Sequence, residues 1–392
     1  MRTRITGGRL IVGERILDAD LLLADGVIEA ILDRSVPHAP SDTVIDAEGL
    51  YVSAGFVDIH QHGGGGADYM DAEADTYRSA TEAHLRHGMT SVMPTLLSAD
   101  TGALLRAIDA YKQAATDGRI RAHLIGMHIE GPYISPRQAG AQKPEHIRTY
   151  DEAEYRAIVT AGEGHIKRWS TAPEVEGADG FAAFAREHGI TLSIAHSDAD
   201  IDTVRHAYDT GFRHITHFYS CMSSITRRGG FRVAGVLEAG YLLDGMDVEI
   251  IADGCHLPPD LLTYVTAFKP TARIALVTDA MRAAGEDVTE SFLGSKSDPL
   301  PVVIEDGVAK MLDRQAFAGS VATCDRLVRT MVQNGTPLPT AVAMVTENPI
   351  RMMRPDLKKG SIREGYDADL CLFDEDIRIR AVLLDGKRIE LS

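Results

Sequence analysis

The sequence predicts an α/β fold: a (β/α)8 TIM barrel with a small β-sandwich domain built from both chain termini. Three observations along the 392 residues lead to this prediction. In the middle of the chain, eight apolar strand-like segments alternate with helical segments, which indicates a parallel sheet that suits closure into a barrel. Both ends of the chain carry short, turn-rich segments of alternating apolar and polar residues. Polar residues that commonly bind metals recur at the ends of the apolar segments.

The two ends of the chain share one pattern. Residues 10–51 and the segment GSIREGYDADLCLFDEDIRIRAVLLDGKRIEL alternate apolar and polar residues, with turn signals such as Asp25-Gly26. Two β segments that flank an α/β middle can pair into one small domain. We therefore predict a β-sandwich over 1–53 and 355–392 and a barrel over 54–354.

The eight predicted barrel strands follow one another through the middle of the chain. They are FVDIH, SVMPTLL, HLIGMHIE, IKRWSTAP, TLSIAHS, HITHF, VEIIADG and RIALVTDA. A helical segment follows each strand, and glycines stand at helix exits such as Gly88, Gly189 and Gly211. This repeated order of strand and helix is typical of a barrel.

Charge and composition limit the classes of partner that the chain is expected to bind. The formal net charge of −17 argues against nucleic acid or an anionic membrane as a partner through bulk electrostatics. No stretch approaches the ~20 apolar residues of a spanning helix, and the N-terminus lacks a signal-peptide pattern. We therefore expect a cytoplasmic protein.

Four widely spaced cysteines without a CxxC motif predict neither a disulfide framework nor a zinc ribbon. Cys221 and Cys255 lie close in sequence to two of the candidate site histidines. We favour small buried thiols beside a polar site over direct metal ligation.

Seven polar residues form the candidate site, and six of them close or directly follow an apolar segment. They are His60, His62, Glu130, His196, His217, His256 and Asp279. Each alone has a plainer explanation: a surface histidine, a loop glutamate or a hydrogen-bonded core histidine. On successive strands of one barrel they would meet at its C-terminal mouth, where such barrels carry their active sites. Together they predict metal-assisted hydrolysis.

Two of the seven suit roles other than metal binding. A carboxylate beside a cation stays ionised, so Asp279 is suited to take a proton from water. His256 is suited to orient a substrate carbonyl or hydroxyl, with a purely structural role as the alternative. We expect the remaining helix and loop histidines to be solvated; they include His84, His87, His165, His188 and His206.

The loop from Thr226 to Arg232 concentrates positive charge in an otherwise acidic chain. Most such loops are simply solvated. Its place just after His217 makes it the best candidate for binding an anionic substrate.

Several motifs, in order and at suitable spacing, are similar to those of one family. They are GFVDIHQHGGGGADYMDA, HIEGPYISPRQAGAQKPEHI, IAHSDA, THFY, IIADGCH, LVTDAM and AGSVAT. They resemble the N-acetylglucosamine-6-phosphate deacetylases of the amidohydrolase superfamily. The resemblance implies a barrel with a small β-sandwich, in agreement with the pattern analysis.

The resemblance implies that Glu130, His196 and His217 bind the primary metal. His60 and His62 match the ligands of a second metal that only some members retain, so one or two ions are expected per subunit. We expect zinc, with iron(II) or manganese(II) as alternatives, because all three accept a mixture of imidazole and carboxylate.

The resemblance also implies roles for the other candidates. Asp279 matches the catalytic acid/base, and His256 matches the histidine that contacts the sugar and the reacting amide. The family is usually dimeric, and its phosphate-binding arginine enters the neighbouring subunit's site. Arg228 is the positional match, with Arg227 a close alternative, and we also place Gly131 among the substrate-binding residues.

The chain departs from the family just after His217. The family usually has asparagine and alanine where this chain has Ser220 and Cys221, which we assign to substrate binding. The family's arginine is typically followed by Glu-Pro-Gly, whereas Arg228 is followed by Gly229-Gly230. These changes put the sugar and the way its phosphate is held in doubt.

The expected reaction is hydrolysis of the N-acetyl group of N-acetyl-D-glucosamine 6-phosphate to glucosamine 6-phosphate and acetate. The alternative is a deacetylase of another N-acetylated sugar or small amide with the same metal site. More distant alternatives are a cyclic amidase, a deaminase and a non-catalytic sugar-phosphate sensor. A cyclic amidase is disfavoured because no lysine ends the fourth strand.

Overall fold

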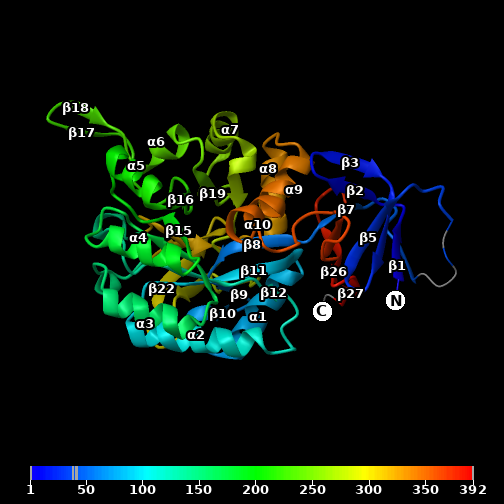
Figure 1. Ribbon diagram of the computed structural model, residues 1–392, viewed down its shortest axis with the longest axis horizontal. Helices are drawn as coiled ribbons and strands as arrows, with labels where there is room; N and C mark the ends of the chain where they lie inside the picture. The colour runs from blue at the N-terminus through cyan, green and yellow to red at the C-terminus, as the bar shows by residue number, and fades with distance from the viewer. Residues whose placement is uncertain (1, 38, 40–42, 391–392) are drawn as a thin grey trace.

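The computed structural model describes residues 2–37, 39 and 43–390. A barrel lies beside a smaller all-β domain that contains both ends of the chain (Figure 1). Within the described residues, eight parallel strands form the barrel, each paired with the next along the chain. These are β8 (Phe56–Gln61), β11 (Met89–Leu96), β13 (Met127–Glu130), β14 (Ile166–Thr171), β15 (Thr191–Ile194), β16 (Phe212–Ile215), β19 (Asp247–Ile250) and β20 (Ile274–Leu276). The predicted barrel is confirmed.

The first and last barrel strands meet and close the sheet. The backbone N–H of Asp279 donates to the carbonyl of His60 at 2.9 Å, and Gln61 bridges Ala280 in parallel. Below them the buried Asp58 carboxylate accepts from the Thr278 hydroxyl and backbone N–H. Closure therefore places the ends of β8 and β20 side by side.

Helices cover the outside of the barrel (Figure 1). They are α1 (Ala74–Leu85), α2 (Thr101–Ala115), α3 (Glu152–Gly162), α4 (Ala178–Glu187), α5 (Ile201–Thr210), α6 (Val236–Leu242), α7 (Pro259–Phe268), α8 (Cys324–Gln333), α9 (Leu338–Val345) and α10 (Glu347–Met353). Asp100, Asp151 and Asp200 cap the starts of α2, α3 and α5 by accepting a backbone N–H. Of the helices described, none is long and apolar enough to cross a membrane.

The expectation of solvated helix histidines is wrong for His84. This residue lies on the inner face of α1 with 1% of its surface exposed. Its Nε2 lies 3.0 Å from the Gly63 carbonyl, and burial lowers its pKa to about 4. The glycine-rich loop after β8 packs against the His84 ring and shields it from solvent.

An antiparallel sheet that the sequence analysis missed interrupts the pattern after β20. It contains β21 (Glu290–Leu293), β22 (Leu300–Glu305), β23 (Val308–Met311) and β24 (Phe317–Ser320). The alternation in PVVIEDGVAKML, with Asp306-Gly307 in left-handed conformation between β22 and β23, was the signal of a hairpin. Its last strand returns to the barrel, where Ser320 N–H donates to the Asp279 carbonyl at 2.7 Å.

The smaller domain consists of two sheets. One contains β1 (Arg2–Thr6), β4 (Asp20–Ala24), β5 (Val27–Leu32) and β6 (Thr43–Asp46). The other joins both ends of the chain through β2 (Arg9–Val12), β3 (Arg15–Asp18), β7 (Tyr51–Ala54), β25 (Leu370–Phe373), β26 (Ile379–Leu384) and β27 (Lys387–Ile389). Apolar side chains such as Leu21, Val52 and Leu372 fill the space between them. The sandwich built from both termini is confirmed; its exact boundaries stay a prediction.

A small hairpin, β17 (Thr226–Arg228) and β18 (Phe231–Val233), extends away from the barrel (Figure 1). Phe231 is 80% exposed near its tip. This arm is the basic loop singled out in the sequence.

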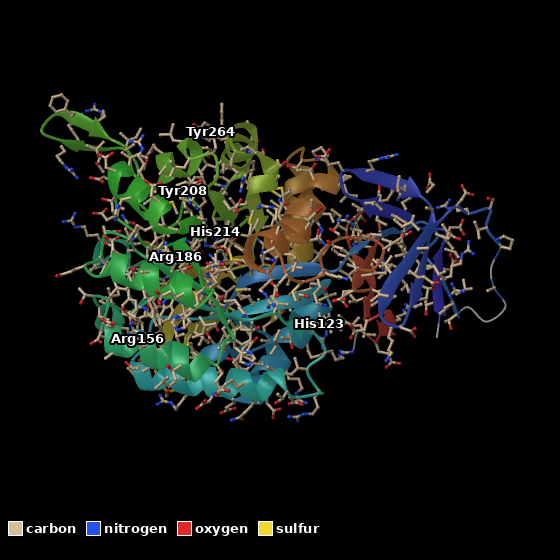
Figure 2. The ribbon with its side chains drawn as sticks, viewed as in Figure 1. His123, Arg156, Arg186, Tyr208, His214 and Tyr264 are labelled. Carbon is tan, nitrogen blue, oxygen red and sulfur yellow. The ribbon has the colours of Figure 1, made fainter. Side chains whose placement is uncertain are left out.

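Buried charge connects the two domains. Asp369, just before β25, accepts from Lys359 Nζ at 2.6 Å and lies 3.2 Å from His123 Nε2 on β12 (His123–Leu124), a short strand beside β11. His123 lies between the barrel and the sandwich in Figure 2. Asp369, His123 and Asp385 could group around a cation, but Asp369 already has the Lys359 ammonium as its partner.

We expect Asp369→Asn to destabilise the protein by about 2–3 kcal/mol at neutral pH, because it removes one of the two carboxylates that pair with the buried Lys359 and leaves only Asp367, at 2.8 Å. Burial by itself raises the pKa of Asp369, but His123 and Lys359 lower it to about 2. The contribution is therefore complete above the ordinary pKa near 4 and lost as the pH falls toward 2. Denaturant unfolding across pH measures it. The exposed Asp376→Asn serves as control, and equal midpoints for both variants would contradict the prediction.

Candidate metal centre and active site

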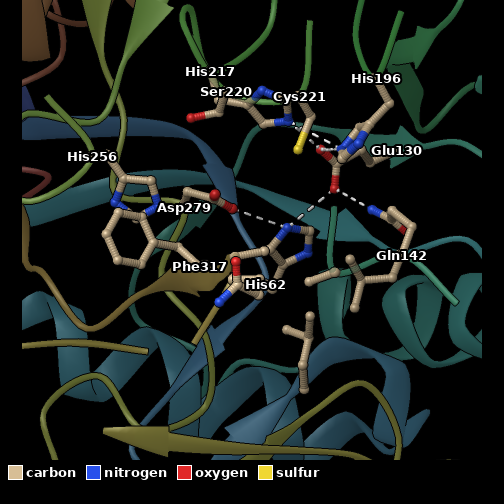
Figure 3. Close-up of a pocket in the computed structure, with 16 residues that line it drawn as sticks. His62, Glu130, Gln142, His196, His217, Ser220, Cys221, His256, Asp279 and Phe317 are labelled. Atoms are coloured by element: carbon tan, nitrogen blue, oxygen red, sulfur yellow. Dashed lines mark hydrogen bonds and ion pairs between the residues drawn. The ribbon is translucent and has the colours of Figure 1, made fainter. Parts of the chain in front are cut away.

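A cavity of about 260 Å³ opens at the C-terminal mouth of the barrel. Six of the seven candidate residues line it (Figure 3). They are His62, Glu130, His196, His217, His256 and Asp279. The seventh, His60, lies fully buried against them, with its Nε2 atom 3.4 Å from Asp279 Oδ1.

Glu130, His196 and His217 bring three donor atoms to one point. Glu130 Oε1 lies 3.2 Å from His196 Nε2 and 3.0 Å from His217 Nε2, and the two nitrogens are 3.2 Å apart. These residues end or follow β13, β15 and β16. A backbone carbonyl holds one of the two rings, since His196 Nδ1 lies 2.7 Å from the Gln138 carbonyl oxygen.

His60, His62 and Asp279 form a second group. Asp279 Oδ1 lies 3.4 Å from His60 Nε2 and 3.1 Å from His62 Nε2. Glu130 stands between the two groups: its Oε1 faces His196 and His217, while its Oε2 lies 3.3 Å from His62 Nε2. One carboxylate therefore contacts both sets of imidazoles.

Three of these residues adopt a backbone conformation that side chains other than glycine rarely take. The φ angles are 47° at His196, 29° at His217 and 48° at Asp279. Each such residue costs about 1–3 kcal/mol, which persists only where the surroundings fix the backbone. All three come just after a barrel strand and line the cavity. The strain therefore coincides with the site.

The cluster is short of positive charge. In the part of the chain that the structure describes, only imidazoles form ion pairs with Glu130 and Asp279. Burial by itself lowers the pKa of His62, but Asp279 and Glu130 outweigh it and raise the pKa to about 10. The same carboxylates raise the pKa of His60 to about 9 against its burial.

A divalent cation fits this chemistry. Two imidazole nitrogens 3.2 Å apart cannot both carry a proton toward each other, yet both point at a carboxylate oxygen. His60 Nε2 is buried without a hydrogen-bond partner among the described residues. Nitrogen and carboxylate oxygen donors suit zinc, iron and manganese alike.

Asp279 and His256 differ in their surroundings. Burial by itself raises the pKa of Asp279, but His60 and His62 lower it below its ordinary value. His256 Nδ1 lies 2.8 Å from the Asp253 carboxylate, and its ring packs on Phe317 at 4.7 Å between centroids. An N–H on Nδ1 bonded to Asp253 turns Nε2 toward the cavity.

Ser220 and Cys221 line the cavity, as Figure 3 shows. Gly131 does not: its φ of 81° turns the chain after Glu130, and a Cβ there would lie 2.0 Å from Ser98 Oγ. Its place is explained by this close packing. No cysteine joins the groups of metal-binding side chains found among the described residues.

The structure does not bring Arg227 and Arg228 into the cavity of their own chain. Both lie on the arm, and Arg228 is 74% exposed and pairs with Asp200 at 3.1 Å.

Gln142 and Phe317 are site residues that the sequence analysis missed. Gln142 Nε2 donates to Glu130 Oε2 at 2.9 Å, and its Oε1 accepts from the backbone N–H of Ser98 at 3.1 Å. Gln142 lies in the Gly- and Pro-rich loop after β13, and such loops often carry function. Phe317 begins β24 and was hidden because the inserted sheet was not recognised.

The comparisons with known proteins agree with this geometry. Residues 51–389 match the model of the amidohydrolase family. The N-acetylgalactosamine-6-phosphate deacetylase of Escherichia coli O157:H7 is 30% identical over 97% of each chain. The N-acetylglucosamine-6-phosphate deacetylase of Bacillus subtilis is 31% identical over 89% of this chain and 85% of its own. The Mycobacterium smegmatis N-acetyl-D-glucosamine-6-phosphate deacetylase, solved as an aspartate-to-alanine variant with N-acetyl-D-glucosamine-6-phosphate, superposes with a TM-score of 0.89 at 30% identity over 99% of both chains.

We expect Glu130→Gln to weaken divalent metal binding at least tenfold, because the change removes the one charge that faces both groups of histidines. Metal content after dialysis, measured by inductively coupled plasma mass spectrometry, tests this. Glu152→Gln, an exposed position at the start of α3, is the matched control. A Glu130→Gln protein that is folded by circular dichroism and keeps its full metal content would refute the assignment.

Proposed function

This chain belongs to the amidohydrolase family, and we propose that it hydrolyses the N-acetyl group of N-acetyl-D-glucosamine 6-phosphate to glucosamine 6-phosphate and acetate. The observation that carries the proposal is the convergence of Glu130, His196 and His217 with Asp279 in one cavity. Similarity to deacetylases of phosphorylated amino sugars over nearly the whole chain supports the substrate class.

Members of the family depend on metals, and we assign the ligands by the two groups of side chains. Glu130, His196 and His217 would hold one cation, and His60 and His62 a second, next to Asp279. When bound, a divalent cation supplies Lewis-acid chemistry, which makes water a stronger nucleophile at neutral pH and polarises an amide carbonyl. We propose zinc as the natural ion.

Asp279 performs the proton transfers. Its lowered pKa keeps the carboxylate ionised at neutral pH, so it accepts the proton of the attacking water. A bond forms between the water oxygen and the acetyl carbon, and the C–N bond then breaks. Asp279 returns this proton to the departing nitrogen, which gives acetic acid and the amine. The acid then loses its remaining proton to the amine, so the products are acetate and the protonated amine.

His256 and its neighbours orient the substrate. Asp253 holds the His256 ring in place. The Nε2 atom of His256 then contacts the sugar and the acetamido oxygen and helps to stabilise the negative charge that develops on that oxygen. Ser220 and Cys221 form the wall toward the rest of the sugar. Gln142 holds Glu130 and so keeps its carboxylate aimed at both groups of imidazoles.

The second candidate substrate is N-acetylgalactosamine 6-phosphate. Two deacetylases of that sugar are among the relatives, at 30% and 32% identity. The two sugars differ only in the configuration at C4 and carry the same acetamido group at C2. The residues proposed for hydrolysis can therefore act on either sugar. The cavity wall away from Asp279 determines which of the two sugars is preferred.

Acetate release from a panel of sugars tests the proposal. We expect one acetate per amine from N-acetylglucosamine 6-phosphate, slower release from its galactosamine counterpart and least from unphosphorylated N-acetylglucosamine. Asp279→Asn should lower kcat about 10²–10⁴-fold, because it removes the group that carries the proton. Metal content measured alongside separates loss of the base from loss of the cation. Binding without acetate release by the wild-type protein would indicate a sensor and end the proposal.

We further propose that two copies pair and that the arm of each enters the site of the other. The arm carries Arg227 and Arg228 away from their own cavity. Exposed apolar side chains lie on the helices behind it: Leu242 at 62%, Tyr264 at 48% and Phe268 at 64%. Tyr264 lies on the same side of the molecule as the arm in Figure 2. Such a patch suits burial against a second copy.

Mixing two differently impaired variants, Arg228→Ala and Asp279→Asn, tests the exchange of arms. Arg228→Ala should raise KM for the phosphorylated sugar far more than for the unphosphorylated one, because a charge-assisted contact to phosphate is lost. In a mixed dimer with Asp279→Asn, the Arg228→Ala copy keeps Asp279 and receives Arg228 from its partner. We therefore expect low KM to return in the mixture.

Arg227→Ala in the same mixture shows which of the two arginines acts. No recovery after subunit exchange, or equal effects of Arg228→Ala on both sugars, would exclude the exchanged arm as a phosphate clamp.

A further inference from the structure

A fully buried ion pair lies in the barrel interior, beneath the candidate metal centre. Arg168 on β14 and Glu249 on β19 both have 0% of their surface exposed, and their side chains form a close contact. A buried pair of this kind costs desolvation of two charges and seldom adds net stability over apolar side chains of similar size. We therefore look to the other contacts of Arg168 and Glu249 for the role of this ion pair.

The Glu249 carboxylate contacts one residue from each group of candidate ligands. Its Oε2 accepts from His60 Nδ1 at 3.2 Å and from the backbone N–H of His217 at 3.3 Å. Its Oε1 accepts from Arg168. A single oxygen thus joins a ligand of the second metal position to the backbone of a ligand of the first.

Arg168 holds that carboxylate in place. Its guanidinium also donates to the Ile59 carbonyl at 3.2 Å, to Ser193 Oγ at 2.9 Å and to Thr216 Oγ1 at 2.8 Å. Burial by itself raises the pKa of Glu249, but Arg168 and His60 outweigh it and hold the pKa well below the ordinary value. The carboxylate is therefore charged, and strands β8, β14, β15 and β16 all fix its position.

The contact between His60 and Glu249 decides which nitrogen of His60 faces the site. When the N–H at Nδ1 donates to Glu249, Nε2 is the nitrogen that remains to bind a metal in the cavity. That Nε2 atom has no hydrogen-bond partner in the described chain and lies 3.4 Å from Asp279 Oδ1 and 3.6 Å from Glu130 Oε1. Metal-binding histidines usually donate their other N–H to a carboxylate, and loss of that partner costs about 10- to 100-fold in metal affinity.

We propose that Glu249, anchored by Arg168, is a positioning residue that sets His60 for metal binding and thereby controls occupancy of the His60–His62 position. It acts through His60 and does not itself touch substrate. The proposal rests on the two-cation centre proposed above.

Two double variants separate the hydrogen bond from the charge. Arg168→Met with Glu249→Gln removes the ion pair but keeps an amide oxygen that can accept from His60 Nδ1. Arg168→Met with Glu249→Leu removes the acceptor as well, and neither variant leaves an unpaired buried charge. Titration of each metal-free protein with Zn²⁺ against a chromophoric chelator yields the number of sites and their affinities. His60→Ala is the reference for a damaged second position.

We expect two Zn²⁺ per wild-type chain and per Gln variant. In the Leu variant the weaker site should lose about 10- to 100-fold in affinity, as in His60→Ala, while the stronger site stays within a few-fold of wild type. Equal affinities in the Gln and Leu variants, or a single Zn²⁺ in the wild type, would overturn the inference.

If neither double variant folds by circular dichroism, Glu249→Asp gives the answer by the same titration. It keeps a charge beside Arg168 but shortens the reach to His60 by one methylene, so the weaker site should again lose affinity; wild-type affinity at that site would overturn the inference. The readout needs no sugar, so failure of the deacetylase proposal in the acetate assay stays distinguishable from failure here.

Discussion

The site depends on the hydrogen bond by which Asp279 N–H donates to the His60 carbonyl and closes the barrel between its first and last strands. Without this closure, His60 and Asp279, which are more than two hundred positions apart in the sequence, would not be held next to each other. With it, His60 and His62 both lie within ion-pair distance of Asp279 and of Glu130. Barrel geometry then brings His196 and His217 to the same mouth. The chemistry of the centre is a consequence of strand pairing.

The candidate metal centre and the barrel interior beneath it differ in how their buried carboxylates are neutralised. Glu130 and Asp279 lie buried with imidazoles as their only ion-pair partners in the described chain, so the cavity favours a cation. One level down, Arg168 and Glu249 neutralise each other and leave the Glu249 carboxylate free to hold His60. Among the described residues, the guanidinium of Arg168 thus lies below the centre, and only imidazoles pair with Glu130 and Asp279 within it.

Substrate recognition is distributed differently from hydrolysis. The residues proposed to carry out hydrolysis stand at strand ends, where the backbone is fixed well enough to hold left-handed residues. Other residues proposed to bind the sugar lie in the segment after β16: Ser220 and Cys221 line the cavity, and Arg228 lies on the exposed arm. Such segments tolerate change without disturbing the centre.

The sequence by itself determined the barrel, the sandwich of both termini and the identity of the seven polar residues, because strand alternation and the residues at strand ends are local patterns. It did not determine the inserted sheet with Phe317, the burial of His84, or the partners Gln142 and Glu249. Glu249 lies inside an apolar strand, and only the closed barrel shows that it faces Arg168 and His60. Likewise, the placement of Arg228 outside its own cavity follows from the path of the arm. Contacts between distant strands are properties of packing, so tertiary structure alone decided them.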